Sequence, residues 1–135
     1  AGEKPAVERA CVLAKEAGAK RALPLPVSVP SHCALMQPAA DQLAKTLANI
    51  SLQTPVTPVI QNVSAQAFDQ PQDIKQALVA QLYSPVQWVQ TLAFFEAQGV
   101  SEYVECGPGN VLAGLGKRTV SGNWQNAEAL IAKES

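Results

Sequence analysis

Helical and strand-like patterns alternate along this chain, and that alternation most constrains how it can fold. Apolar spacing and helix-start signals predict helices over 5–17, 38–49, 73–82, 84–98 and 110–119 and a short one after residue 126. Short apolar runs predict strands over 21–29, 57–63 and 103–106. Strands separated by helices are typical of layered α/β folds. Because so few strands make a weak sheet, we expect partner strands from elsewhere.

The strand predicted over 21–29 is unusual because it contains prolines. Its apolar residues alternate onto one face: Leu23, Leu25, Val27 and Val29. Pro24 and Pro26 fall on the other face and cannot donate hydrogen bonds to a neighbouring strand. We therefore expect this strand to lie at the edge of a sheet or to be only partly paired.

Turn and cap residues define the connections between these elements. Residues 30–36 are expected to form a turn with one helical turn, and 51–56, 64–72 and 120–125 are expected to be loops or linkers. Ser84 is expected to cap the helix that follows it, with Pro85 in the first helical position. Asn110 and Asn126 are expected to cap the last two helices.

Composition excludes several classes of function. The net charge of −1 and the absence of a basic run argue against nucleic-acid binding. No apolar stretch approaches the roughly 20 residues that span a bilayer, and the first residues lead into a helix rather than a signal peptide. The three cysteines form no CxxC pair, so we expect free thiols, no metal site and a cytoplasmic protein.

The only histidine in the chain, His32, is the candidate acid–base group. It follows a predicted strand end, where sites in α/β folds gather. Its neighbours Ser31 and Cys33 are poorly placed to face it, so neither is a convincing nucleophile. On its spacing alone, His32 fits a surface or capping histidine better than a catalytic one. Cys106 could meet His32 in space, but its position favours a structural thiol.

A second candidate feature is the turn Gly107-Pro108-Gly109, which joins a predicted strand to a predicted helix. Such a turn exposes backbone N–H groups that can hold an anion or line a pocket, but it is also an ordinary connection. Glu102 and Glu105 lie three residues apart on the preceding strand and point to opposite faces, which makes them a poor acid–base pair.

Four blocks of sequence, in order, resemble the malonyl-CoA:acyl carrier protein transacylases of bacterial type II fatty-acid synthesis. The blocks are Leu25–Met36 with its continuation through Asp41, Val59–Val63, Gln81–Trp88 and Gly107–Leu112. The resemblance implies transfer of malonyl from coenzyme A, through a malonyl-serine, to the phosphopantetheine thiol of acyl carrier protein. It implies no further cofactor, since the coenzyme A thioester is a substrate.

The resemblance also implies roles for individual residues. His32 is the base, and the backbone carbonyl of Gln81 orients its ring in place of the aspartate of a Ser-His-Asp triad. Asn62 lies in the pocket, and the Gly107-Pro108-Gly109 turn supports the site. Ser31 beside His32 resembles the pattern of malonyl-specific enzymes.

The chain departs from the family by lacking the GQG segment, the GHSxGE elbow with the serine, and the arginine that binds the malonyl carboxylate. We therefore expect a C-terminal part: residues 1–30 from a ferredoxin-like small subdomain and 31–135 from the hydrolase-like large one. The expected partners of this chain are therefore malonyl-CoA, acyl carrier protein and the missing N-terminal half of the enzyme. The chain alone should be inactive.

Two alternatives to a stand-alone transacylase remain open. One is the malonyl-type acyltransferase domain of a polyketide synthase, which shares the histidine and the GPG turn. The other is a non-catalytic module that binds an acidic carrier protein through basic residues such as Lys117 and Arg118.

Overall fold

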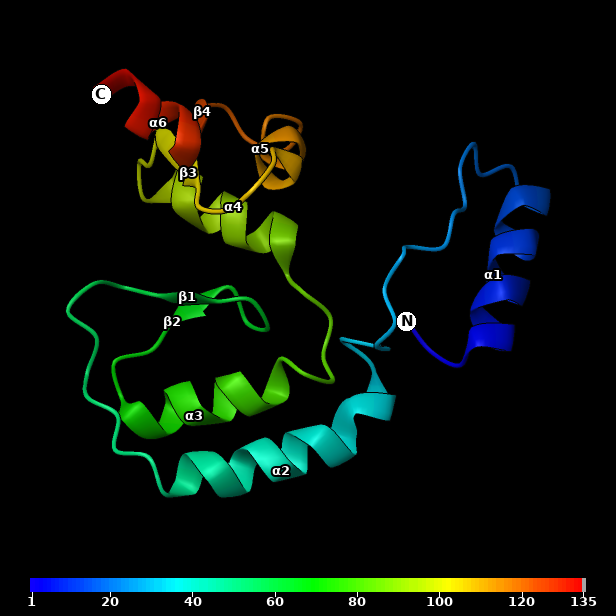
Figure 1. Ribbon diagram of the computed structural model, residues 1–135, viewed down its shortest axis with the longest axis horizontal. Coiled ribbons are helices and arrows are strands. Elements are labelled where there is room, and N and C mark those ends of the chain that lie inside the picture. The colour runs from blue at the N-terminus through cyan, green and yellow to red at the C-terminus, as the bar shows by residue number, and fades with distance from the viewer. Residues whose placement is uncertain (135) are drawn as a thin grey trace. The chain divides into compact units, whose positions relative to one another are not determined.

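Helices and short strands alternate along the chain in the computed structural model, which describes residues 1–134 (Figure 1). The elements fall into two units, Ala1–Val86 and Gln87–Ser135. This order and content fit the α/β class predicted from the sequence. Within the described residues, no helix has both the length and the apolar character needed to cross a membrane.

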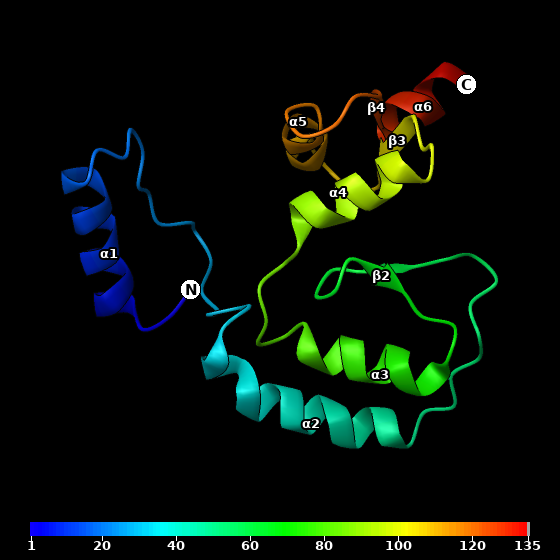
Figure 2. The same ribbon diagram turned by 180° about the vertical axis from the view of Figure 1, so that it is seen from behind.

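The first unit is mainly helical. Its elements are α1 (Lys4–Glu16), the short 3-10 helix η1 (Ala34–Met36), α2 (Gln37–Ala48), β1 (Ile60–Gln61), β2 (Gln66–Ala67) and α3 (Pro71–Ala80). A proline stands in the first turn of each α-helix, where its missing N–H has no helical acceptor to lose. α2 and α3 lie side by side in both views, and α3 also contacts β1 (Figures 1 and 2).

The strand predicted over 21–29 does not form. These residues make no strand pairing in the structure, and their alternating apolar side chains are half or more exposed: Leu23, Leu25, Val27 and Val29. A strand is stable only when a neighbour satisfies its backbone groups, and no strand among residues 1–134 does so here. Pro24 and Pro26 weaken the segment further because they cannot donate.

The strand predicted over 57–63 is reduced to β1, and part of the predicted loop 64–72 is its partner β2. The two pair antiparallel, Ile60 opposite Ala67 and Gln61 opposite Gln66. The chain reverses because the carbonyl of Gln61 accepts the N–H of Ala65 at 2.8 Å, with Ala65 in a left-handed conformation (φ 55°). Backbone pairing of this length leaves no apolar pattern for sequence reasoning to detect.

The second unit is built around a parallel strand pair. Its elements are α4 (Trp88–Ala97), β3 (Glu102–Glu105), α5 (Val111–Gly116), β4 (Asn123–Asn126) and α6 (Ala127–Glu134). β3 and β4 pair along their whole length, from Glu102 opposite Asn123 to Glu105 opposite Asn126. Parallel neighbours need a crossover, and the segment with α5 supplies it. The linker predicted over 120–125 is therefore wrong: its end is a polar strand.

Aromatic packing forms the core of this unit. Leu92, Tyr103 and Val120 are buried, and Trp88, Phe95 and Trp124 pack against them, which confirms the predicted apolar stripe of α4. The rings of Tyr103 and Trp124 stack with their centroids 4.2 Å apart, and Phe95 meets Tyr103 edge-on. Tyr103 Oη donates to the carbonyl of Val100 at 3.0 Å, so the phenol keeps a partner.

Several helix boundaries differ from prediction. The helix expected from Ser84 begins at Trp88, and the helix expected to reach Thr119 ends at Gly116. Asn110 makes no side-chain cap. Asn126 is confirmed as a cap, since its Oδ1 accepts the N–H of Glu128 at 2.7 Å.

Two glycines of α5 provide a matched test of this packing. A Cβ on Gly116 would overlap the Trp124 ring, whereas a Cβ on Gly114 would meet nothing within 4 Å. We expect Gly116→Ala to lower the free energy of unfolding by about 1–3 kcal/mol. Gly114→Ala should raise it by up to about 1 kcal/mol through helix propensity. Chemical denaturation of both variants measures the difference; equal effects would contradict the packing described here.

Candidate functional site

His32 lies in the turn that precedes η1 and α2, and its backbone is unusual. Its φ is 63°, in the left-handed region that residues other than glycine seldom occupy. Such a conformation costs on the order of 1–3 kcal/mol and persists where surrounding contacts enforce it. Here the backbone N–H of His32 donates to the carbonyl of Leu82 at 2.9 Å, which ties the strained residue to the turn after α3.

The imidazole ring is held by carbonyls of the same turn. Nδ1 lies 2.9 Å from the carbonyl oxygen of Gln81 and 3.2 Å from that of Ser84. Carbonyl oxygens only accept hydrogen bonds, so Nδ1 must carry the proton. In the neutral ring Nε2 then bears the lone pair. Nε2 makes no hydrogen bond within residues 1–134, and the side chain is exposed, so it is open to a proton from a reacting group.

The flanking residues do not assist the ring. Ser31 is exposed, and Cys33 Sγ donates to the carbonyl of Pro30 at 3.1 Å. Cys11, Cys33 and Cys106 are free cysteines. Cys106 belongs to the second unit, so a pairing with His32 stays a hypothesis of the sequence alone.

Asn62 also belongs to the first unit, in the turn between β1 and β2. Its Oδ1 is buried and accepts no hydrogen bond from the described residues. No hydrogen bond joins it to His32 within residues 1–134, so its predicted place in the pocket stays a prediction.

The Gly107-Pro108-Gly109 turn depends on its glycines and on a distant asparagine. Gly107 and Gly109 have φ of 150° and 89°, which side chains rarely permit. Asn126 Nδ2 donates to the carbonyl oxygens of both glycines, while its Oδ1 caps α6. One buried amide therefore fixes the turn and starts the next helix.

Two N–H groups at the start of α5 are already occupied by a side chain of this unit, whereas the anion-holding interpretation of the Gly107–Gly109 turn stays a prediction. Glu105 is buried, and its Oε1 and Oε2 accept the N–H groups of Leu112 and Ala113 at 3.1 and 2.9 Å. A carboxylate at a helix N-terminus satisfies two donors and complements the helix dipole. Glu105 thus performs the capping predicted for Asn110. The sequence feature that could have predicted this cap is the acidic residue Glu105, seven positions before Leu112, whose N–H it accepts.

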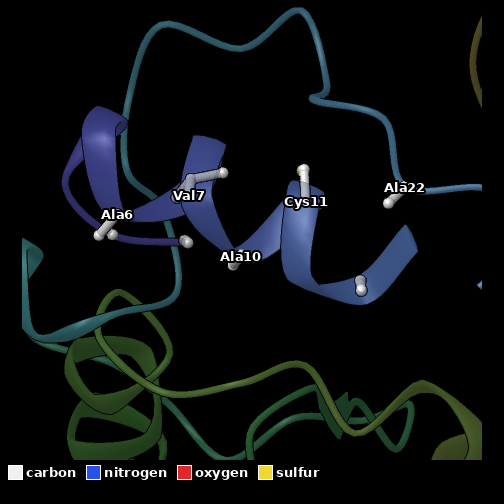
Figure 3. A pocket seen from close by; sticks show the side chains of 8 residues that line it. Ala6, Val7, Ala10, Cys11 and Ala22 are labelled. Carbon is white, nitrogen blue, oxygen red and sulfur yellow. The ribbon is translucent and has the colours of Figure 1, made fainter. Parts of the chain in front are cut away.

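Elsewhere the described residues offer little chemistry. They contain no cluster of three or more His, Cys, Asp or Glu able to hold a metal ion. A hollow beside α1 is lined by small side chains, and its labelled residues Ala6, Val7, Ala10 and Cys11 lie on the helix while Ala22 lies on the segment after it (Figure 3). Apart from the Cys11 thiol these side chains are aliphatic, so the hollow is not a candidate catalytic site.

Comparison with known proteins identifies close relatives. No model of a protein family matches the chain. It is 58% identical over 120 residues to the malonyl CoA-acyl carrier protein transacylase of Salmonella typhimurium, covering 89% of this chain and 39% of that protein. It is 47% identical over 117 residues to the transacylase of Bacillus subtilis, covering 87% of this chain and 37% of the relative.

Solved structures agree. The acyl carrier protein S-malonyltransferase of Vibrio cholerae matches with a TM-score of 0.89 and 59% identity, over 93% of this chain and 42% of that one. A malonyl-transacylase solved in complex with its type II PKS acyl-carrier protein matches with a TM-score of 0.87 and 54% identity, over 93% and 40%. The chain therefore spans about two fifths of the length of the relatives it matches.

The two glutamates of β3 allow a controlled test of the helix cap. Glu105→Ala should lower the free energy of unfolding by about 1–2 kcal/mol and speed hydrogen exchange at Leu112 and Ala113, because their N–H groups lose a buried acceptor. Glu102→Ala on the exposed face should cost much less, although Glu102 accepts a hydrogen bond from Asn123. Amide hydrogen exchange measured by NMR distinguishes the effect of Glu105→Ala from that of Glu102→Ala. Unchanged exchange at Leu112 and Ala113 would show that the cap is unimportant.

Proposed function

We propose, on the premise that this chain is related to the C-terminal part of the malonyl CoA-acyl carrier protein transacylases, that it supplies the histidine base of a malonyl transfer. The observation that carries the proposal is the His32 ring, whose Nδ1 lies 2.9 Å from the Gln81 carbonyl oxygen and whose Nε2 is open. The acyl acceptor serine, the oxyanion donors and the arginine for the malonyl carboxylate belong to the part of the enzyme outside this sequence.

The proposed reaction has two halves, and His32 moves one proton in each. First, Nε2 takes the proton of the serine hydroxyl as its oxygen attacks the thioester carbonyl of malonyl-CoA. The imidazolium then returns that proton to the departing sulfur of coenzyme A. Second, Nε2 takes the proton of the phosphopantetheine thiol as its sulfur attacks the malonyl-serine ester, and returns it to the serine oxygen.

The carbonyls at the end of α3 suit this task. An imidazole that gains and loses a proton twice per cycle must keep its orientation and its tautomer. The carbonyl of Gln81 fixes the orientation and the tautomer of the ring, as the carboxylate does in a Ser-His-Asp triad, but without a formal charge. The carbonyl oxygen of Ser84 lies 3.2 Å from the same Nδ1 atom and further restricts the orientation of the ring.

The remaining parts of the proposal follow the family. Residues 1–30 would belong to the ferredoxin-like small subdomain, and residues 31–135 would belong to the hydrolase-like large one. Ser135 lies outside the residues that the structure describes. Asn62 and Ser31 would line the pocket and the Gly107–Gly109 turn would support it. Malonyl-CoA and acyl carrier protein would be the substrates in cytoplasmic fatty-acid synthesis, with exposed Lys117 and Arg118 available to an acidic carrier.

A chimaera tests the proposal. This chain would replace the matching segment of the Salmonella typhimurium transacylase, and transfer from malonyl-CoA to acyl carrier protein would be measured. The parent chimaera should be active, and His32→Ala should reduce kcat by about 100-fold or more, as expected for loss of an acid–base group.

Two further measurements are needed to interpret a loss of activity. The thermal unfolding midpoint must show that His32→Ala still folds. Carrier-protein binding by the parent chimaera without any transfer would favour a non-catalytic binding module, and full activity of His32→Ala would remove His32 from the mechanism.

The chain alone should form no malonyl-enzyme, because it lacks the GHSxGE segment with the nucleophilic serine. Mass spectrometry of the purified chain after incubation with malonyl-CoA measures this directly. A stable adduct of malonyl mass on any residue would contradict the expectation, and the chimaera serves as the positive control.

A further inference from the structure

The carbonyl of Gln81 is available to His32 for a reason that lies four residues further on. In an α-helix, the N–H of each residue donates to the carbonyl four positions earlier. The helical partner of the Gln81 carbonyl would therefore be the N–H of residue 85. That residue is Pro85, which has no N–H to donate.

The helical hydrogen bonding of α3 continues as far as the carbonyl of Ala80. The Gln81 N–H donates to Ala77, as in a continuing helix, and the N–H groups of Tyr83 and Ser84 both donate to Ala80. The N–H groups of residues 81 to 84 thus all donate to carbonyls that precede Gln81, and residue 85 has no N–H. The carbonyls of Gln81, Leu82 and Ser84 accept instead from the ring or the backbone of His32.

Pro85 has a second effect in the same direction. The proline ring disfavours helical backbone in the residue before it, which is Ser84. The regular helix α3 ends at Ala80 and α4 begins only at Trp88, so residues 81–87, which include Pro85, separate the two helices. A residue with an N–H at position 85 would permit one more helical hydrogen bond, and that bond would end on the Gln81 carbonyl.

We propose that Pro85 is a positioning residue for malonyl transfer: by lacking an N–H, it reserves the Gln81 carbonyl for Nδ1 of His32. Pro85 touches no reacting atom in this scheme. It acts through Gln81 on the tautomer and orientation of the imidazole, and so on the availability of Nε2. The link to catalysis rests on the proposed function, whereas the effect on the tautomer does not.

Pro85→Ala in the chimaera is the first test, because alanine restores the competing N–H. We expect kcat to fall about tenfold, as for the loss of one hydrogen bond, with KM for malonyl-CoA within about twofold of the parent. The NMR signals of ¹⁵N-labelled His32, assigned by their absence in His32→Ala, should show a smaller fraction of the tautomer with the proton on Nδ1. A purely structural role would not move that ratio.

Pro71→Ala is the matched control. Pro71 stands in the first turn of the same helix α3, where an added N–H has no helical carbonyl to reach. This variant should keep both the kcat and the tautomer ratio of the parent. A loss equal to that of Pro85→Ala would assign the effect to altered helix stability and overturn the proposal.

A second variant isolates the missing donor from the proline ring. N-methylalanine in place of Pro85, introduced by ligation of a synthetic segment at Cys33 and Cys106, has no N–H and no ring. It should retain parent-like kcat and tautomer ratio even if Pro85→Ala folds poorly.

Each contrary result has one meaning. Parent-like kcat and tautomer ratio in Pro85→Ala, or an impaired N-methylalanine variant, would overturn the role of Pro85. Full activity of His32→Ala would instead overturn the proposed function, and would leave the tautomer measurement standing.

Discussion

The hydrogen bond from His32 Nδ1 to the Gln81 carbonyl joins two segments that lie 49 residues apart in the chain, and the candidate site depends on it. It gives the ring one tautomer and leaves the other nitrogen open. The backbone bond from His32 to Leu82 holds the same turn and sustains a left-handed φ that isolated histidine would not favour. The end of α3 therefore both terminates a helix and orients the imidazole ring of His32.

The second unit uses polar contacts of the same kind. Glu105 at the end of β3 caps α5, and Asn126 at the end of β4 holds the Gly107–Gly109 turn and caps α6. Because β3 and β4 are paired in parallel, Glu105 and Asn126 lie opposite each other in register. The strand pair thus places two buried polar side chains next to each other, one bound to the start of α5 and one to the Gly107–Gly109 turn. The stacked Tyr103 and Trp124 rings pack against the same pair.

The segment 21–29 shows what happens when a pattern lacks its partners. Its alternation is that of a strand, yet its apolar side chains are exposed, because no strand among residues 1–134 pairs with it. The chain spans about two fifths of its relatives' length, so a sequence pattern here need not be satisfied within the chain itself. Local propensity sets which conformation is favoured; only neighbours make it stable.

The sequence by itself determined the positions of the main helices, the stripe of Trp88, Leu92 and Phe95, the short strand before the GPG turn, and His32 as the single candidate base. These follow from periodicity, proline and glycine placement and residue chemistry, which are local. The family resemblance implied the Gln81 carbonyl beside His32, but tertiary structure alone decided the pairing of β4 with β3, the capping of α5 by Glu105 rather than Asn110, and the second carbonyl at His32, that of Ser84. Those features consist of backbone and polar contacts between residues far apart in the chain, and such contacts leave no periodic pattern for a sequence to display.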